Sequence, residues 1–250
     1  MVYGRKFQEQ YLKVGVGKVI EGEAVQINVT APPNTGKSGV VDYLRRRYSD
    51  IFGESKVATV KYPVYRPEDH GLTDYLDTGR RIDEYIRGNE DGVKNPENWD
   101  VREAQSWYAI NRFFFDIKIR EWLETKEVII SEDGKYTSVV WGCLMDQNIS
   151  RRELEQLNEG IIEPDIRFTL RGPRLGGIEP SHIFEQSSLW NDCKRVHLEL
   201  AGFDGWEIID YERLETEDSV KKERERVGEE IVKRSSKLFP FETQRRLGSW

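Results

Sequence analysis

The residues best suited to chemistry lie in the loop Ala31–Ser38, which has the sequence APPNTGKS. The loop follows an apolar alternation over residues 25–29 and precedes an amphipathic run. A strand that feeds a tight loop at the start of a helix aims several backbone N–H groups at one point, which favours phosphate oxygens there. Lys37 would reach the β- and γ-phosphates of a nucleotide, and the Ser38 hydroxyl would bind Mg²⁺. The loop therefore predicts a nucleotide-binding site.

Two features of this loop depart from the usual pattern. Ala31 replaces the first glycine, and the two prolines that follow it have no N–H to donate. The donors that matter most come later in the loop and are retained. We expect the phosphates of ATP to be bound by Asn34, Thr35, Gly36, Lys37, Ser38 and Gly39.

Two carboxylates follow a short apolar run at residues 128–130. Such a run predicts a buried parallel strand, and open α/β sheets bind ligands at the carboxyl ends of their strands. Glu132 and Asp133 would then lie beside Ser38, where their oxygens would complete the Mg²⁺ site or accept a hydrogen bond from an acceptor hydroxyl. Alternatively, either Glu132 or Asp133 has a structural role and caps the segment that follows the strand.

The longest helix candidate, residues 101–124, has two different faces. One face is apolar and consists of Trp107, Ile110, Phe114 and Ile117. The nearly opposite face carries Gln105, Tyr108 and Arg112. A solvated polar stripe is one interpretation of this second face. A ligand surface is the other, because a ring, an amide and a guanidinium together suit a flat base and a phosphate.

The remaining segments predict an α/β domain. Strands are expected at 56–63, 166–170 and 206–210, and a short helix is expected around 80–86. Because strands alternate with helical or loop sequence, the pattern favours a parallel sheet. The long excursion over 64–98 is of a kind that usually carries function.

Glycine and proline also mark a flap over residues 171–186, which contains three glycines and two prolines. A helix should follow it and end at Gly202. Its inward residues are expected to be Leu189, Cys193, Val196 or His197, and Leu200. The charge-rich segment 219–237 predicts a last helix whose charges form a solvated face.

Composition favours one folded domain at residues 24–250, preceded by an N-terminal extension at 1–23. The 250-residue chain has a formal net charge of −7, which disfavours a nucleic-acid binder. Cys143 and Cys193 lack metal-ligand spacing and are expected to be incidental thiols of a cytoplasmic protein. Neither a signal sequence nor a membrane-spanning run is expected, and a homodimer is left open.

Taken in order, these features resemble the thymidylate kinase family of P-loop nucleoside monophosphate kinases, over about residues 24–232. The resemblance is carried by Ala31–Ser38, Tyr62-Pro63, Thr78-Gly79-Arg80, Tyr108–Arg112, Glu132-Asp133, Trp141-Gly142, Pro164-Asp165, Gly177-Ile178-Glu179, His182 and Glu185. Their order and spacing are more specific than the phosphate-binding loop alone.

The resemblance implies a P-loop kinase fold with a five-stranded parallel sheet, helices on both faces and a lid over 171–186. It also implies Mg-ATP as donor and dTMP as acceptor. The acceptor would be bound by Tyr62, Gln105, Tyr108, Asn111 and Arg112, and the lid would contribute Arg171, Arg174, His182 and Glu185. The catalytic residues would be Lys37, Arg112, Glu132 and Asp133, with the metal on Ser38, Glu132 and Asp133.

Three departures from the family pattern leave other functions open. Pro33-Asn34 stands where most of the family has an acid that contacts the acceptor sugar, no arginine follows Glu132-Asp133, and the flap has few basic residues. A kinase of deoxynucleosides or modified nucleotides would keep the same fold. A non-catalytic nucleotide-binding protein is the alternative from another class, while a motor ATPase is disfavoured because nothing indicates a nucleic-acid surface.

Overall fold

The computed structural model of the protein describes residues 23–73, 76–87, 100–175, 182–186, 189–212 and 216–248. Almost all of the predicted N-terminal extension therefore lies outside the described residues. The same is true of the end of the excursion, residues 88–98, and of the middle of the predicted flap, residues 176–181.

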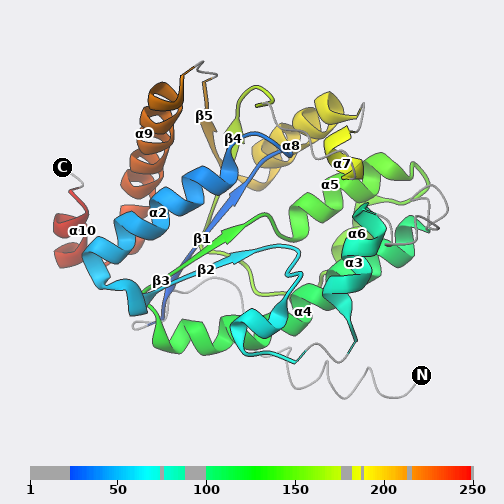
Figure 1. Ribbon diagram of the computed structural model, residues 1–250, viewed down its shortest axis with the longest axis horizontal. Helices are drawn as coiled ribbons and strands as arrows, with labels where there is room; N and C mark the ends of the chain where they lie inside the picture. Colours follow the sequence, from blue (N-terminus) through cyan, green and yellow to red (C-terminus); the bar gives the residue numbers. More distant parts are fainter. Residues whose placement is uncertain are drawn as a thin grey trace.

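Five parallel strands form one sheet in this part of the chain, as predicted (Figure 1). They are β1 Val25–Thr30, β2 Val57–Lys61, β3 Val128–Glu132, β4 Ile166–Arg171 and β5 Glu207–Asp210, in the order β2-β3-β1-β4-β5. The register pairs Val29 of β1 with Glu132 of β3. The phosphate-binding loop and the two carboxylates therefore leave the same edge of the sheet from neighbouring strands.

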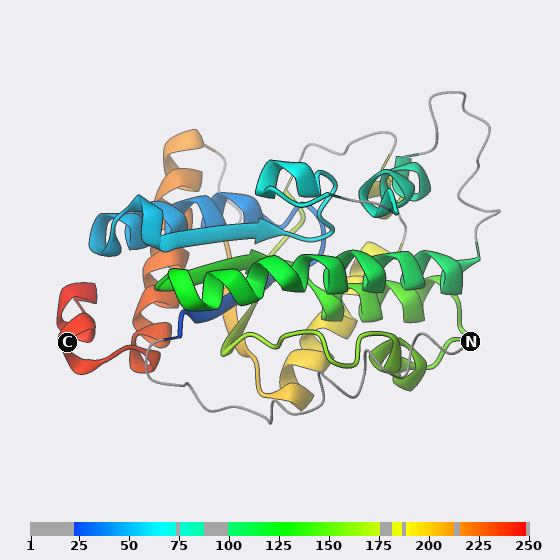
Figure 2. The same ribbon diagram turned by 90° about the horizontal axis from the view of Figure 1, so that it is seen from below.

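Helices cover both faces of this sheet. The α-helices are α2 Lys37–Phe52, α3 Thr78–Arg87, α4 Val101–Thr125, α5 Lys135–Met145, α6 Arg151–Leu157, α7 Ile183–Gln186, α8 Trp190–Asp204, α9 Glu217–Ser235 and α10 Phe241–Leu247. Alternating side chains of β3 show the two layers. Val128 and Ile130 pack in the core beneath α2 and α9, whereas Ile129 packs in the core beneath α4. Figure 2 shows α4 running along that second face.

The mixed face of α4 points into the protein, so the solvated-stripe interpretation is wrong. Gln105, Tyr108 and Arg112 are all buried, whereas Ile117 of the apolar face is 60% exposed. Trp107 is only partly buried, and the guanidinium of Arg81 lies 4.5 Å from the centre of its ring. Since polar side chains are buried only where they find partners or a cavity, this orientation already indicates a polar cavity beneath the helix.

Two helix predictions need correction. Helix α8 continues through Gly202 and ends at Asp204, because the next residue, Gly205, has a φ of 68° in the left-handed conformation that glycine favours. The charges of α9 are not all solvated. Glu223 is 5% exposed, and its carboxylate accepts a hydrogen bond from the backbone N–H of Glu212 at 2.8 Å.

None of the helices in the described residues is long and apolar enough to span a bilayer.

Candidate functional site

The loop between β1 and α2 has the shape of a phosphate cradle. Asn34 and Gly36 have positive φ values of 58° and 94°, which turn the chain sharply into the first turn of α2. Although it has no N–H to donate, Pro32 stabilises the loop through its carbonyl group. The carbonyl of Pro32 accepts hydrogen bonds from the Thr35 hydroxyl at 2.7 Å and from Lys37 Nζ at 3.2 Å. Lys37 is thereby held inside the loop.

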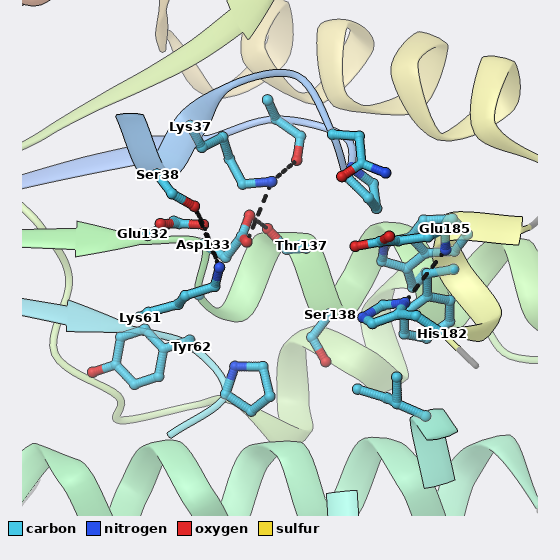
Figure 3. A pocket seen from close by; sticks show the side chains of 18 of the residues that line it. Lys37, Ser38, Lys61, Tyr62, Glu132, Asp133, Thr137, Ser138, His182 and Glu185 are labelled. Atoms are coloured by element: carbon cyan, nitrogen blue, oxygen red, sulfur yellow. Dashed lines mark hydrogen bonds and ion pairs between the residues drawn. The ribbon is translucent and has the colours of Figure 1, made fainter. Parts of the chain in front are cut away.

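The end of β3 brings a carboxylate to the start of α2. Ser38 Oγ donates to Glu132 Oε1 at 3.0 Å, and the Glu132 side chain is almost fully buried. Lys61, at the end of β2, places its Nζ 3.1 Å from the same Glu132 oxygen and 3.4 Å from Ser38 Oγ. Figure 3 shows these side chains pointing toward one another. Glu132 therefore binds the ammonium group of Lys61 at the place where the metal ion is predicted.

Asp133 joins the loop lysine to the start of α5. Its Oδ2 lies 3.4 Å from Lys37 Nζ, and its Oδ1 accepts a hydrogen bond from the Thr137 hydroxyl at 3.0 Å (Figure 3). The backbone carbonyl of Asp133 accepts from Asn28 Nδ2 at 2.6 Å. Asp133 has a φ of 62°, which is uncommon for a non-glycine residue, and these hydrogen bonds stabilise that conformation. The sheet thus fixes both carboxylates beside the loop.

These oxygens suit a magnesium ion, which protein kinases and ATPases hold through one or two carboxylates together with substrate phosphates. No cluster of three His, Cys, Asp or Glu side chains that could hold a metal by itself occurs among the described residues. The hydroxyl of Ser38 and the carboxylates of Glu132 and Asp133 would hold Mg²⁺ here, with the nucleotide supplying the remaining oxygens.

We expect the double substitution Glu132→Gln with Asp133→Asn to raise the Mg²⁺ concentration needed for half-maximal activity. Loss of carboxylates at a metal site should weaken metal affinity about ten- to a hundredfold, by analogy with changes to the groups that orient metal ligands. Titration of activity with Mg²⁺ measures the effect. Glu127→Gln, an exposed carboxylate before β3, is the matched control. An unchanged titration in the double variant would refute the assignment.

A cavity of about 350 Å³ extends from this loop to the buried face of α4. Residues that line it include Asn34, Gly36, Lys37, Ser38, Gly39, Lys61, Tyr62, Tyr65, Gln105, Tyr108, Arg112, Glu132, Asp133, Thr137, Ser138, Trp141, Leu175, His182, Phe184, Glu185 and Arg224. Thr35 and Asn111 are buried nearby but are not among its lining residues. The phosphate cradle and the mixed face of α4 therefore open into the same space.

Aromatic rings form the wall at the α4 end. Trp141 and Phe184 stack with their ring centres 4.3 Å apart and their planes 22° from parallel. The Tyr108 hydroxyl is buried and has no hydrogen-bond partner among the described residues, and burial raises its pKa well above the usual value. Gln105 Oε1 accepts a hydrogen bond from the Ser138 hydroxyl. This wall offers flat apolar surface together with a few polar groups.

Two predicted acceptor residues occupy different positions. Tyr62 lines the cavity, and burial raises the pKa of its phenol. Asn111 instead fixes the chain that leaves β2, because its amide donates to the Val64 carbonyl and accepts from the Val64 N–H, both at 2.9 Å. The same amide donates to the Thr78 hydroxyl at 2.9 Å.

Arg112 is a buried cation whose hydrogen-bond partner among the described residues is neutral. The residue is 2% exposed, and its Nε and Nη2 donate to Asn158 Oδ1 at 3.0 and 2.7 Å. Burial lowers its pKa to about 10. The charge of Asp116, one turn further along α4, favours the charged form of Arg112, but no ion pair joins the two side chains among the described residues. Because a buried charge that is only partly compensated is unfavourable, a bound anion would be stabilised at this end of the cavity. Asn158 follows α6, and no sequence motif connects it to Arg112.

Asp116, one turn further along α4, gives the protein a pH-dependent stability. Burial raises its pKa to about 6, although the carboxylate accepts a hydrogen bond from the Ile162 N–H at 2.9 Å. In the unfolded chain the pKa is about 4, so the folded state binds the proton more tightly. This contribution is complete below about pH 4 and is lost as the pH rises through about 6.

We therefore expect Asp116→Asn to raise the free energy of unfolding at pH 7 by about 1–3 kcal/mol, because the amide needs no proton to remain neutral. Chemical denaturation at pH 4 and pH 7 measures the effect. The advantage of the variant should shrink at the lower pH. An equal difference at the two pH values would contradict the ionisation of Asp116 as its cause.

The four predicted lid residues separate into two groups. Arg171 is the last residue of β4, and its guanidinium pairs with Asp210 of β5 at 2.6 and 2.8 Å, outside the cavity lining. Arg174 has buried Nε and Nη2 groups without a hydrogen-bond partner in the described part of the chain. His182 and Glu185 do line the cavity, opposite the phosphate-binding loop (Figure 3).

Several lining residues were not predicted from the sequence. Lys61 immediately precedes the predicted Tyr62-Pro63 pair, and its position at a strand end was the available signal. Ser138 lies on α5, which was not predicted as a helix. Leu175 reaches the loop because its N–H donates to the Asn34 carbonyl at 2.7 Å. Arg224 comes from α9, about 190 residues after the loop, and had no local signal.

Comparison of the sequence with protein-family models finds no match, and comparison with curated proteins finds none either. Solved structures do share the fold. One is a thymidylate kinase from Ehrlichia chaffeensis, with a TM-score of 0.61, 17% identity, and coverage of 84% of this chain and 98% of that one. Another is a thymidylate kinase from Candida albicans, with a TM-score of 0.56, 16% identity, and coverage of 80% and 88%. This chain therefore has a thymidylate kinase-like fold.

Proposed function

We propose that the protein transfers the γ-phosphoryl group of Mg-ATP to a pyrimidine deoxynucleoside monophosphate, with dTMP as the preferred acceptor. One observation carries this proposal. A single cavity is lined at one end by Lys37 and Ser38 of the phosphate cradle and at the other by the buried cation Arg112. Two phosphate-binding groups that face one space suit the transfer of a phosphoryl group between two nucleotides.

The residues supply position and charge rather than covalent chemistry, which is what phosphoryl transfer requires. Lys37 would bind the β- and γ-phosphates of the donor. Arg112 would bind the acceptor phosphate and hold it in line with them. Bound Mg²⁺ would neutralise charge that develops on the donor phosphates. The buried walls of the cavity would limit competing attack by water.

The acceptor base would lie against the aromatic wall. The stacked rings of Trp141 and Phe184 and the ring of Tyr108 suit a flat base, while Gln105 offers an amide to its edge. Polar groups left unpaired in a buried site penalise a wrong base strongly. A single methyl group in an apolar pocket is worth only about 1–3 kcal/mol, so we expect a preference for dTMP over dUMP of roughly ten- to two-hundredfold.

A screen for ADP release tests this function against its alternatives. The protein is incubated with Mg-ATP and, separately, with nucleosides and nucleoside monophosphates of each base. Pyrimidine deoxynucleoside monophosphates should give the fastest turnover. Faster turnover with thymidine would indicate a nucleoside kinase. If AMP or GMP were the best acceptor, the aromatic wall would not be a pyrimidine-binding site. Binding of ATP without turnover on any acceptor would indicate a non-catalytic protein.

A further inference from the structure

Arg224 of α9 reaches the phosphate cradle from the far end of the chain. Its side chain lines the cavity together with Gly36, Ser38 and Gly39. The sequence places it in a helix so rich in charge that no single residue is distinguished from its neighbours. In the fold, however, α9 packs along α2, and Arg224 lies over the first turn of that helix.

Close packing fixes this position. A Cβ atom on Gly39 would lie 2.4 Å from Nε and 2.8 Å from Cζ of Arg224, so only a glycine leaves room for the guanidinium as it is placed. The two helices approach closely at a second point as well. A Cβ atom on Gly228 of α9 would lie 2.1 Å from the ring of Tyr43 on α2. The two glycines thus let α9 hold Arg224 against the start of α2.

The guanidinium of Arg224 also differs from the other arginines of α9 in its partners. Its guanidinium lies beside the phenol of Tyr211, a neutral group, and its Nε is buried and has no hydrogen-bond partner among the described residues. Arg226 pairs with Glu223 at 2.7 Å, and Arg234 pairs with Glu207 at 2.9 Å and with Glu230 at 2.7 Å. A buried donor without a partner costs free energy that a bound acceptor would recover.

We propose that Arg224 binds the phosphate chain of the donor nucleotide, at the α- and β-phosphates that the backbone N–H groups of the loop cradle. The inference rests on the proposed function, because it takes a nucleoside triphosphate as the ligand of the loop. A planar guanidinium can donate two parallel hydrogen bonds to phosphate oxygens. Both of these phosphates remain in ADP, so the contact persists after transfer of the γ-phosphoryl group.

Calorimetric titration with ADP tests this role. Arg224→Ala should weaken ADP binding about ten- to a hundredfold, the range for loss of a hydrogen bond to a charged group. Arg224→Lys keeps the charge but cannot donate two parallel hydrogen bonds, so its affinity for ADP should lie between those of the alanine variant and the wild type. Lys222→Ala removes an exposed cation from the same helix and should bind ADP as the wild type does.

Two further measurements separate contact from damage to the fold. Thermal unfolding of Arg224→Ala without nucleotide should match that of the wild type, and its affinity for dTMP, which depends on the other end of the cavity, should be unchanged. Equal ADP affinity in Arg224→Ala and the wild type would overturn the inference and leave the proposed function standing. Failure of the wild-type protein to bind ADP would overturn both.

Discussion

Replacement of Lys37 by alanine is expected to lower the rate of phosphoryl transfer about 10²–10³-fold, by analogy with other positioned charges that act on a transition state. The structure explains how the charge is positioned. Lys37 Nζ is held by the Ala31 carbonyl at 2.9 Å and by the Pro32 carbonyl at 3.2 Å, within the loop that would surround the phosphates. Asp133 Oδ2 lies 3.4 Å from Lys37 Nζ and forms an ion pair with it.

The measurement is steady-state turnover of Lys37→Ala with saturating Mg-ATP and dTMP. Lys56→Ala is the matched control, because it removes an exposed lysine near the opposite end of β2. Thermal unfolding of both variants should show that the fold is retained. Turnover of Lys37→Ala within a few-fold of the wild type would mean that the loop is not the donor site.

Arg112→Ala is expected to lose most activity toward dTMP, roughly 10²–10³-fold, because the variant lacks the cation that would bind the acceptor phosphate. The hydrogen bonds of Arg112 to the neutral Asn158 side chain orient the guanidinium without neutralising it. Asp116 compensates part of this charge but forms no ion pair with Arg112 among the described residues, so the guanidinium can still pair with a ligand anion. The loss should appear in the KM for dTMP as well as in kcat, because the ground state also contains the phosphate.

Thymidine distinguishes this role from general damage to the pocket. Thymidine lacks the phosphate, so its binding to Arg112→Ala should match its binding to the wild type, whereas dTMP should bind much more weakly. Lys118→Ala removes a cation from the surface of the same helix, where it pairs with Glu121, and serves as the control. Equal loss of thymidine and dTMP binding would show that Arg112 supports the pocket rather than the phosphate.

The sequence was sufficient to predict the parts of the fold that depend on local pattern. The apolar runs at residues 25–29 and 128–130 are strands β1 and β3, and they lead into the phosphate-binding loop and the two carboxylates, respectively. Parallel strands bring their carboxyl ends to one edge of the sheet, so Ser38 and Glu132 were expected to be neighbours. Their hydrogen bond of 3.0 Å confirms that expectation of contact.

Contacts that depend on helix packing could not be predicted in this way. The two faces of α4 were recognised, but only the fold shows that Arg112 is inside and Ile117 outside. Asn158, which follows α6 and contacts Arg112, and Arg224 of α9 belong to segments without a nucleotide-binding motif. Their positions depend on how α6 and α9 pack, which a single sequence does not specify at the level of local pattern.

The most direct test of the central claim is the fate of a labelled γ-phosphoryl group. Wild-type protein is incubated with Mg²⁺, dTMP and ATP that carries the label in its γ-phosphoryl group, and the products are separated. The account predicts labelled dTDP. Its rate of formation should be about 10²–10³-fold lower in Lys37→Ala and in Arg112→Ala than in the wild type. Label found only in inorganic phosphate, or left entirely in ATP while both nucleotides bind, would contradict it.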